Sequence, residues 1–120
     1  MLTRMRVNFS DLRDHRFNHS FNCPSPICDC TVEIESPEHF FLRCPKYISQ
    51  RQILLSNIAT AIHADPSVLP DSHLTNILLF GSPSYNNITN KIITNASLHY
   101  IKSTGRFKKI EAYRDNISAP

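Results

Sequence analysis

The sequence contains no tryptophan, only two glycines and no long hydrophobic run. A membrane-spanning helix needs about 20 consecutive apolar residues, so none is expected here. The first residues, MLTRMRVNFSDLRDHRF, alternate basic and apolar side chains, which is not the pattern of a secretory signal peptide. We therefore expect an intracellular protein, in the nucleus or the cytoplasm and not secreted, whose cysteines stay reduced.

Length and composition predict a single globular domain. The 120 residues are 41% hydrophobic and 19% charged, which is typical of a folded chain of this size. The net charge of +3 is unevenly distributed, because residues 29–38 contain acids and no base, whereas residues 102–109 contain bases and no acid. The expected segments are a basic helical segment at 1–22, a cysteine-rich knuckle at 23–45, a helical bundle at 46–105 and a basic, frayed tail at 106–120.

Prolines interrupt the cysteine-rich segment and predict a compact turn followed by a short helix. Residues 31–34, with Thr, Val and Ile, suit a short strand or hairpin. Ser-Pro-Glu at 36–38 is typical of a helix start, with a capping hydroxyl, a proline and an acid in the first turn. This helix should end at Cys44, because Pro45 disfavours helical geometry at the residue before it.

The second half of the chain predicts three helices. They cover residues 46–63, 73–80 and about 88–103, and Gly81 and Gly105 are placed to end the last two. In the last helix, the side chains expected to face the core are Ile88, Ile92, Ala96, His99 and Tyr100.

Three cysteines and one histidine follow the spacing C-x-C-x8-H-x4-C, at Cys28, Cys30, His39 and Cys44. Thiolate sulfur and imidazole nitrogen are ligands of tetrahedral zinc. His39 and Cys44 lie about 140° apart on an ideal helix, so the chain must open at Cys44 for both to reach one ion. Four protein ligands leave no corner for water or substrate, which predicts a structural Zn²⁺ site and not a catalytic one. The predicted fold class is mainly α, a small helical domain with one zinc-knuckle-like hairpin or turn at about residues 26–44.

Other interpretations of these residues remain open. The thiols could be ordinary buried side chains beside a surface histidine, although two cysteines in C-x-C cannot easily both face a core. A catalytic Cys–His pair would need one activated thiolate and an oxyanion site, and the sequence indicates neither. Cys23 is a spare thiol that could replace Cys28 as a ligand.

The chain resembles the zinc-binding C-terminal segment of reverse transcriptases from non-LTR (LINE-type) retrotransposons. The resemblance rests on CDC…ESPEHFFLRCP with the preceding LTRMRVNFSDLRDHRFNHSFNC, and on ILLFGSPSYNNITNKIITNASLHYIKSTGRFKKIEAY in the second half. It implies that Cys28, Cys30, His39 and Cys44 bind zinc, and that the chain is not an enzyme but an accessory part of an RNA-directed DNA polymerase. Thr31 stands where the family usually has glycine, so we expect a strained turn there.

The resemblance implies contact with template RNA or target DNA during target-primed reverse transcription. The knuckle's carboxylates would repel phosphates, so basic residues outside the metal site are expected to contact them. The predicted nucleic-acid-binding residues are Arg4, Arg6, Arg13, Arg16, Arg43, Lys46, Arg51, Lys102, Arg106, Lys108 and Lys109. One alternative is an interaction module in which zinc supports a helical surface that docks on the polymerase domain of the same element. Another is a non-functional remnant of an element.

Overall fold

The computed structural model describes residue 25 and residues 27–106. This part of the chain is mainly helical, as predicted, and contains no β-strand. Its elements in chain order are η1 (His39–Arg43), η2 (Pro45–Tyr47), α3 (Ile48–Ile62), η3 (Pro66–Val68), α4 (Asp71–Phe80) and α5 (Asn87–Thr104). None of the described helices has the length and apolarity that crossing a membrane requires. The predicted N-terminal helix, Cys23 and the tail after Arg106 lie outside the described residues.

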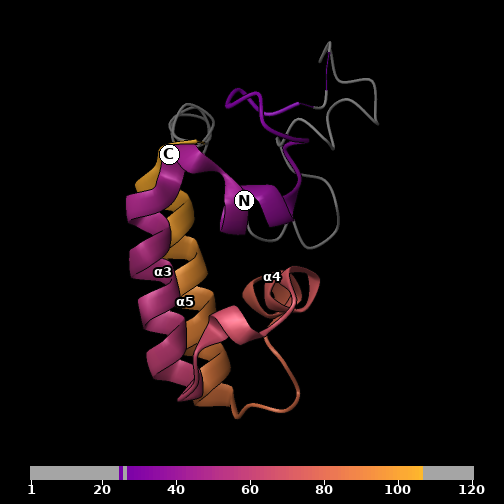
Figure 1. Ribbon diagram of the computed structural model, residues 1–120. Coiled ribbons are helices and arrows are strands. Elements are labelled where there is room, and N and C mark those ends of the chain that lie inside the picture. Colours follow the sequence, from indigo (N-terminus) through magenta and orange to yellow (C-terminus); the bar gives the residue numbers. More distant parts are fainter. Residues whose placement is uncertain (1–24, 26, 107–120) are drawn as a thin grey trace, which may run out of the picture.

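Helices α3 and α5 lie side by side and run in opposite directions, and α4 lies across them (Figure 1). The predicted helices at 46–63 and 73–80 are confirmed, although the first begins as the separate 3-10 turn η2. The shared core includes the aliphatic side chains of Leu54 and Ile58 from α3, Ile77 and Leu78 from α4, and Ile93 and Ile101 from α5. Burial of these side chains supplies the main stabilisation of the helical body.

The inward face of α5 differs from the prediction. Three residues that we expected to face the core are exposed: Ile88, Ile92 and His99. The buried residues of the helix are Ile93, Ala96, Ser97, Tyr100 and Ile101. The Ser97 hydroxyl donates a hydrogen bond to the Leu78 carbonyl oxygen at 2.9 Å, which allows a polar side chain to face the core. Because hydrophobic spacing does not count a serine as a core residue, it does not predict this face. The observed buried face of α5 is rotated around the helix axis relative to the predicted one.

The turn between α4 and α5 is fixed by Gly81 and Asn90. Gly81 has a φ of 71°, and a Cβ added there would lie 2.6 Å from Asn90 Oδ1. Asn90 Oδ1 accepts the backbone N–H of Ser82 at 3.0 Å, and its Nδ2 donates to the Ser82 carbonyl at 2.9 Å. Helix α5 then begins with Asn86, whose side chain accepts the Thr89 N–H at 2.7 Å. Glycine is therefore required at the predicted end of α4 for both its conformation and its lack of a side chain.

An aromatic cluster joins the short turn η1 to α5. The ring of Tyr100 lies 5.3 Å from that of Phe40 and 5.4 Å from that of Phe41, measured between centroids. The Tyr100 hydroxyl donates a hydrogen bond to the Phe40 carbonyl. Burial raises the pKa of Tyr100, and it raises the pKa of Tyr47 to about 12, so both phenols remain protonated donors at neutral pH. The cluster holds the segment that carries His39 firmly against the helical body.

Candidate metal centre

The first two candidate ligands lie on a hairpin-like turn. It is closed by one antiparallel bridge between Ile27 and Ile34, and the Cys28 N–H donates to the Glu33 carbonyl at 2.9 Å. The Thr31 N–H donates to the Cys28 carbonyl at 2.8 Å, which makes the tip of the turn tight. Thr31 has a φ of 66°, in the left-handed region that a β-branched residue rarely adopts. The expected strained turn is therefore present, whereas a regular strand is not.

The other two ligands lie at the ends of the π-helical turn η1 (His39–Arg43). The turn starts as predicted, since the Ser36 hydroxyl accepts the His39 N–H at 3.2 Å. It ends with the Cys44 N–H donating to the His39 carbonyl at 2.8 Å, a hydrogen bond across five residues. Cys44 itself is extended, with a ψ of 123°, as expected before proline. The estimate of 140° between His39 and Cys44 assumed an α-helix, and the wider π turn brings the two residues onto one side instead.

The four candidate ligands converge. Their donor atoms all lie within 4.8 Å of one another, so this group could hold a metal ion. Cys28 Sγ and Cys44 Sγ are 3.8 Å apart, and Cys30 Sγ and His39 Nε2 are 3.2 Å apart. A tetrahedral ion with Zn–S of about 2.3 Å and Zn–N of about 2.0 Å would have edges of about 3.8 and 3.5 Å. The two distances are close to these edges, so the donor set fits a small tetrahedral ion once its widest pair, up to 4.8 Å apart, closes by about 1 Å.

Glu33 orients the histidine. Its Oε1 lies 2.8 Å from His39 Nδ1, on the side of the ring opposite the thiols, and Arg43 Nε lies 2.8 Å from the same oxygen. With Nδ1 protonated and bound to the carboxylate, the lone pair of Nε2 faces the three sulfurs. A carboxylate that fixes the tautomer of a ligating imidazole in this way is a common feature of metal sites.

Glu35 and Arg106 occupy the other side of the site. Glu35 is buried, with 3% of its surface exposed, and its Oε2 lies 3.8 Å from Cys28 Sγ. Arg106 binds this carboxylate through two hydrogen bonds, Nε to Oε2 at 3.0 Å and Nη2 to Oε1 at 2.8 Å. A buried carboxylate beside thiols is costly unless it is paired, and the guanidinium supplies that pairing.

The three thiols differ in acidity. Burial raises the pKa of Cys28 to about 12 and also raises the pKa of Cys44. Burial acts in the same direction on Cys30, but hydrogen bonds from the Val32 and Glu33 backbone and from the neighbouring thiols outweigh it and lower its pKa. Without a metal ion, Cys28 and Cys44 are therefore protonated at neutral pH. A metal ion would displace their protons, because thiolates are the ligating form.

The arrangement suits a structural role for the metal. His39 and Cys44 are fully buried, Cys28 is nearly so, and only Cys30 is partly exposed. All four tetrahedral positions would be filled by the protein, which leaves none for a substrate. The site connects the hairpin to the first turn of the helical body, and the contacts of Glu33 with His39 and Arg43 and of Glu35 with Arg106 join the same two parts.

Five of the predicted nucleic-acid-binding residues are described, and three of them are held by the protein itself. Arg106 is bound by Glu35, and Arg43 lies within 3.7 Å of three carboxylates, those of Glu33, Glu38 and Asp71. Arg51 donates to the carbonyls of Phe41 at 3.0 Å and Cys44 at 2.5 Å. These hydrogen bonds explain why a charged side chain lies among the apolar residues on the inner side of α3. Lys46 and Lys102 are exposed. The residues outside the described part are Arg4, Arg6, Arg13, Arg16, Lys108 and Lys109.

Sequence reasoning missed the roles of Glu33 and Glu35. Both were interpreted only as part of an acidic stretch, and Arg106 only as a basic residue of the tail. The sequence did contain one indication, because Glu33 and Glu35 alternate with Ile34. Two acidic residues separated by one residue on a hairpin point to the same face, here toward the metal site. The distant partner Arg106 left no signal in the local sequence.

Comparison with known proteins found no match: no protein-family model matches the chain, and no curated protein or solved structure is significantly similar to it. The site must therefore be interpreted from its own geometry.

Proposed function

We propose that Cys28, Cys30, His39 and Cys44 bind Zn²⁺, and that the ion is structural. Three thiolates and one imidazole at tetrahedral spacing favour zinc over magnesium or calcium, which prefer oxygen ligands. The supporting observation is the convergence of the four donor atoms together with the Glu33 contact that presents Nε2 of the histidine. Structural zinc sites contribute about 10–16 kcal/mol of apparent binding free energy at neutral pH, which is large for a chain of this size.

Elemental analysis of protein purified without added metal tests the zinc assignment. We expect one equivalent of zinc, with three of the four thiols protected from alkylation and Cys23 reactive. Cys44→Ser should lower the zinc content and the unfolding temperature, whereas Cys23→Ser should change neither. A Cys23→Ser variant that loses zinc while Cys28→Ser retains it would assign the fourth ligand to Cys23 instead.

We further propose that the zinc-stabilised domain binds nucleic acid as a non-catalytic accessory part of a larger polymerase system. Its closed metal site supports a non-catalytic role, and its charge distribution supports nucleic-acid binding. The described part of the chain contains six Lys or Arg and six Asp or Glu, so the net charge of +3 resides in residues 1–24 and 107–120. On this proposal those terminal segments, together with Lys46 and Lys102, contact phosphates, in the role that the resemblance to retrotransposon reverse transcriptases implies.

Salt titration of RNA and DNA binding tests this role. Each lysine or arginine that contacts a phosphate contributes about 0.7 to 0.9 to the slope of log affinity against log salt concentration. We expect Lys108→Glu/Lys109→Glu to weaken binding and reduce the slope, with the zinc content unchanged. An unchanged affinity and slope in this variant, and in Arg4→Glu/Arg6→Glu, would contradict the proposal.

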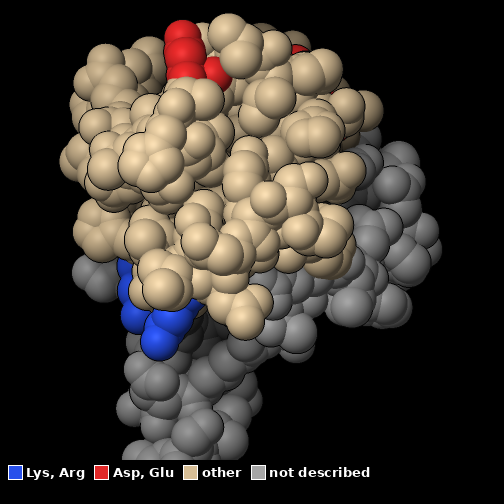
Figure 2. All heavy atoms as spheres, turned by 90° about the horizontal axis from the view of Figure 1, so that it is seen from below, with Lys and Arg blue, Asp and Glu red and all other residues tan. Residues whose placement is uncertain are grey.

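A protein-docking role is the second candidate, and one observation favours it. The described atoms on one face of the molecule belong almost entirely to uncharged residues (Figure 2). Val68 and Ile88 are 75% and 73% exposed, in segments at the end of the α3–α5 pair where η3 follows α3 and α5 begins. Such apolar exposure suits a protein contact. Binding to the polymerase domain of the same element, lost in Val68→Asp/Ile88→Asp, together with no affinity for RNA or DNA, would select this role.

A further inference from the structure

The helix pair α3–α5 differs in charge from the rest of the described chain. Neither α3 nor α5 contains an acidic residue. The described acids lie elsewhere: four in the segment 29–38, one at Asp65 and one at Asp71. The bases of the pair are Arg51, which is bound to backbone carbonyls, and Lys91 and Lys102, for which no ion pair is formed among the described residues. A phosphate approaching this pair would meet positive charge and no carboxylate of the pair itself.

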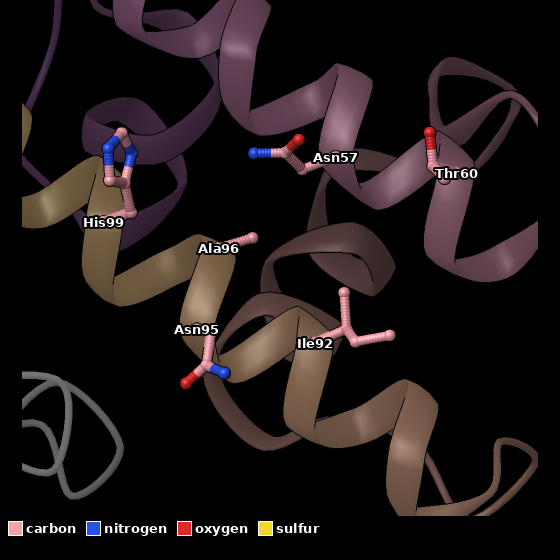
Figure 3. A pocket seen from close by; sticks show the side chains of 6 residues that line it. All are labelled: Asn57, Thr60, Ile92, Asn95, Ala96 and His99. Carbon is pink, nitrogen blue, oxygen red and sulfur yellow. The ribbon is translucent and has the colours of Figure 1, made fainter.

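A groove of about 450 Å³ runs between the two helices. It is lined by Asn57, Thr60, Ile92, Asn95, Ala96 and His99. Figure 3 shows Asn57 extending from α3 toward α5, Ile92 and Ala96 directed into the space between the helices, and His99 at one end. The lining combines amide groups, a hydroxyl and an imidazole with a small apolar floor, and it carries no carboxylate. These are the groups that bind an unpaired nucleobase, by hydrogen bonds to its edge and by contact with its faces.

The free lysines lie along the same helix as the groove residues. Lys91, Asn95, His99 and Lys102 follow one another at steps of four, four and three residues, so they lie along one side of α5, and all four are exposed. At a rise of 1.5 Å per residue, the two lysines are about 16 Å apart along the axis. A stacked strand carries one phosphate about every 3.4 Å, so this distance spans about five phosphates. The two lysines thus lie along α5, one toward each end of the groove, at a spacing that suits one strand.

We propose that the α3–α5 groove binds single-stranded nucleic acid. Lys91 and Lys102 contact its phosphates, and an unpaired base enters the groove against Ile92 and Ala96. Asn57 bonds to the base edge and His99 packs on its face, while Asn95, which points away from α3, borders the groove (Figure 3). This inference rests on the proposed nucleic-acid-binding function and assigns a place to it. It also gives a reason for the exposed Ile92 and His99, which contribute little to the core.

Fluorescence anisotropy with the full chain, loaded with zinc, tests the groove. The probes are a short single-stranded RNA of mixed sequence, the same sequence as single-stranded DNA, the corresponding duplex, and a single strand with abasic sites. We expect Asn57→Ala/His99→Ala to weaken single-strand binding about tenfold, since contact with one base contributes on that scale. The slope of log affinity against log salt concentration should not change in this variant. Lys91→Gln and Lys102→Gln should each reduce the slope by about 0.7.

Two matched controls come from α4, where His73 and Asn76 are exposed and lie outside the groove. His73→Ala and Asn76→Ala should bind as the unaltered chain does. The abasic strand should bind the unaltered chain more weakly than the intact strand does. It should bind the unaltered chain and Asn57→Ala/His99→Ala with the same affinity. RNA and DNA strands are distinguished by their relative affinities for the unaltered chain.

Three results would overturn the inference. If the groove variants bind like the α4 controls while Lys108→Glu/Lys109→Glu loses affinity, the chain binds nucleic acid elsewhere and the proposed function stands without the groove. If the duplex binds as tightly as the single strand and abasic sites have no effect, no base enters the groove. If the unaltered chain binds none of the probes in low salt, the groove and the proposed nucleic-acid-binding function are both wrong.

Discussion

Arg106 and Glu35 lie 71 residues apart in the sequence and form a two-point ion pair beside the metal site. Arg106 follows Gly105, the residue that ends α5, and Glu35 follows the hairpin that carries Cys28 and Cys30. The pair therefore connects the C-terminal end of the last helix to the candidate metal centre. It also balances a carboxylate that lies 3.8 Å from a ligand sulfur.

Arg106→Ala should destabilise the chain strongly. It would remove the two-point partner of the buried Glu35 carboxylate, which lies next to the thiolates, and removing one partner of a buried pair costs about 3–5 kcal/mol. We take the lower end of this range because Arg106 retains 21% exposure. Chemical denaturation with zinc present measures the change. Lys102→Ala, four residues earlier and exposed, is the matched control and should lie within about 0.5 kcal/mol of the unaltered chain.

A double variant separates charge pairing from packing. Arg106→Ala/Glu35→Gln also removes the buried negative charge, so it should be more stable than Arg106→Ala alone. Equal stability of the two variants would show that the guanidinium contributes mainly by packing and that the buried charge is not the cause.

Glu33→Ala should weaken zinc binding about 10- to 100-fold, the usual effect of removing a partner that orients a ligand. The loss follows because His39 Nδ1 would no longer be fixed and Nε2 would no longer be directed at the thiols. Competition with a chromogenic chelator measures the affinity. Glu38→Ala is the control, because Glu38 also contacts Arg43 but not the histidine. A similar loss in both variants would attribute the effect to Arg43.

Thr31→Gly should stabilise the zinc-bound chain. A residue with a side chain loses roughly 1 kcal/mol in the left-handed conformation, and glycine does not. Part of this gain is offset by the hydrogen bond that the Thr31 hydroxyl donates to the Cys30 carbonyl at 2.7 Å. Thr60→Gly, on the exposed side of α3, should instead destabilise the chain, because glycine has the lower helix propensity. A loss of stability in Thr31→Gly comparable to that in Thr60→Gly would mean that the hydroxyl outweighs the strain.

The stability of the metal-free chain and that of the zinc-bound chain should change in opposite directions with pH. In the metal-free chain the pKa of Cys28 is raised from 9.0 to about 12, so the folded state binds more protons than the unfolded state between these values. Its stability should therefore be retained below pH 9 and fall as the pH rises toward 12. The zinc-bound chain holds thiolates, so its stability should fall on acidification instead.

Calorimetry of zinc binding in buffers with different ionisation enthalpies measures the protons released. We expect at least two per ion at pH 7, from Cys28 and Cys44, whose pKa values are both raised. A release of fewer than two would mean that one of these thiols is not a ligand.

Local rules predicted much of the helical body and the ligand set. Ser36 begins the short turn, Pro45 ends it, and Gly81 and Gly105 end the last helices, because each of these residues acts on its own backbone. The convergence of the four ligands followed from their spacing and the need to fill a tetrahedron.

The features that the sequence did not predict depend on distant or polar contacts. The predicted inward face of α5 was right for Ala96 and Tyr100 and wrong for its other three residues, because Ser97 is buried against a carbonyl of α4, which no hydrophobic spacing indicates. Arg51 and Arg106 were predicted to contact phosphates, and their partners within the protein were not predicted because they lie 7 and 71 residues away. The π geometry of η1 was missed because the spacing between His39 and Cys44 was read on an α-helix.

The π turn makes the length of the segment between His39 and Cys44 a requirement in its own right, in addition to its composition. The hydrogen bond from Cys44 to His39 closes a ring that needs all the residues between them, and the same two residues present the sulfur and the ring nitrogen. Leu42 is only partly buried, so its side chain can be exchanged, whereas Phe40 and Phe41 are buried in the aromatic cluster and Arg43 pairs with Glu33. Deleting or inserting a single residue between 39 and 44 would turn the sulfur away from the imidazole, so related chains should keep the same number of residues there.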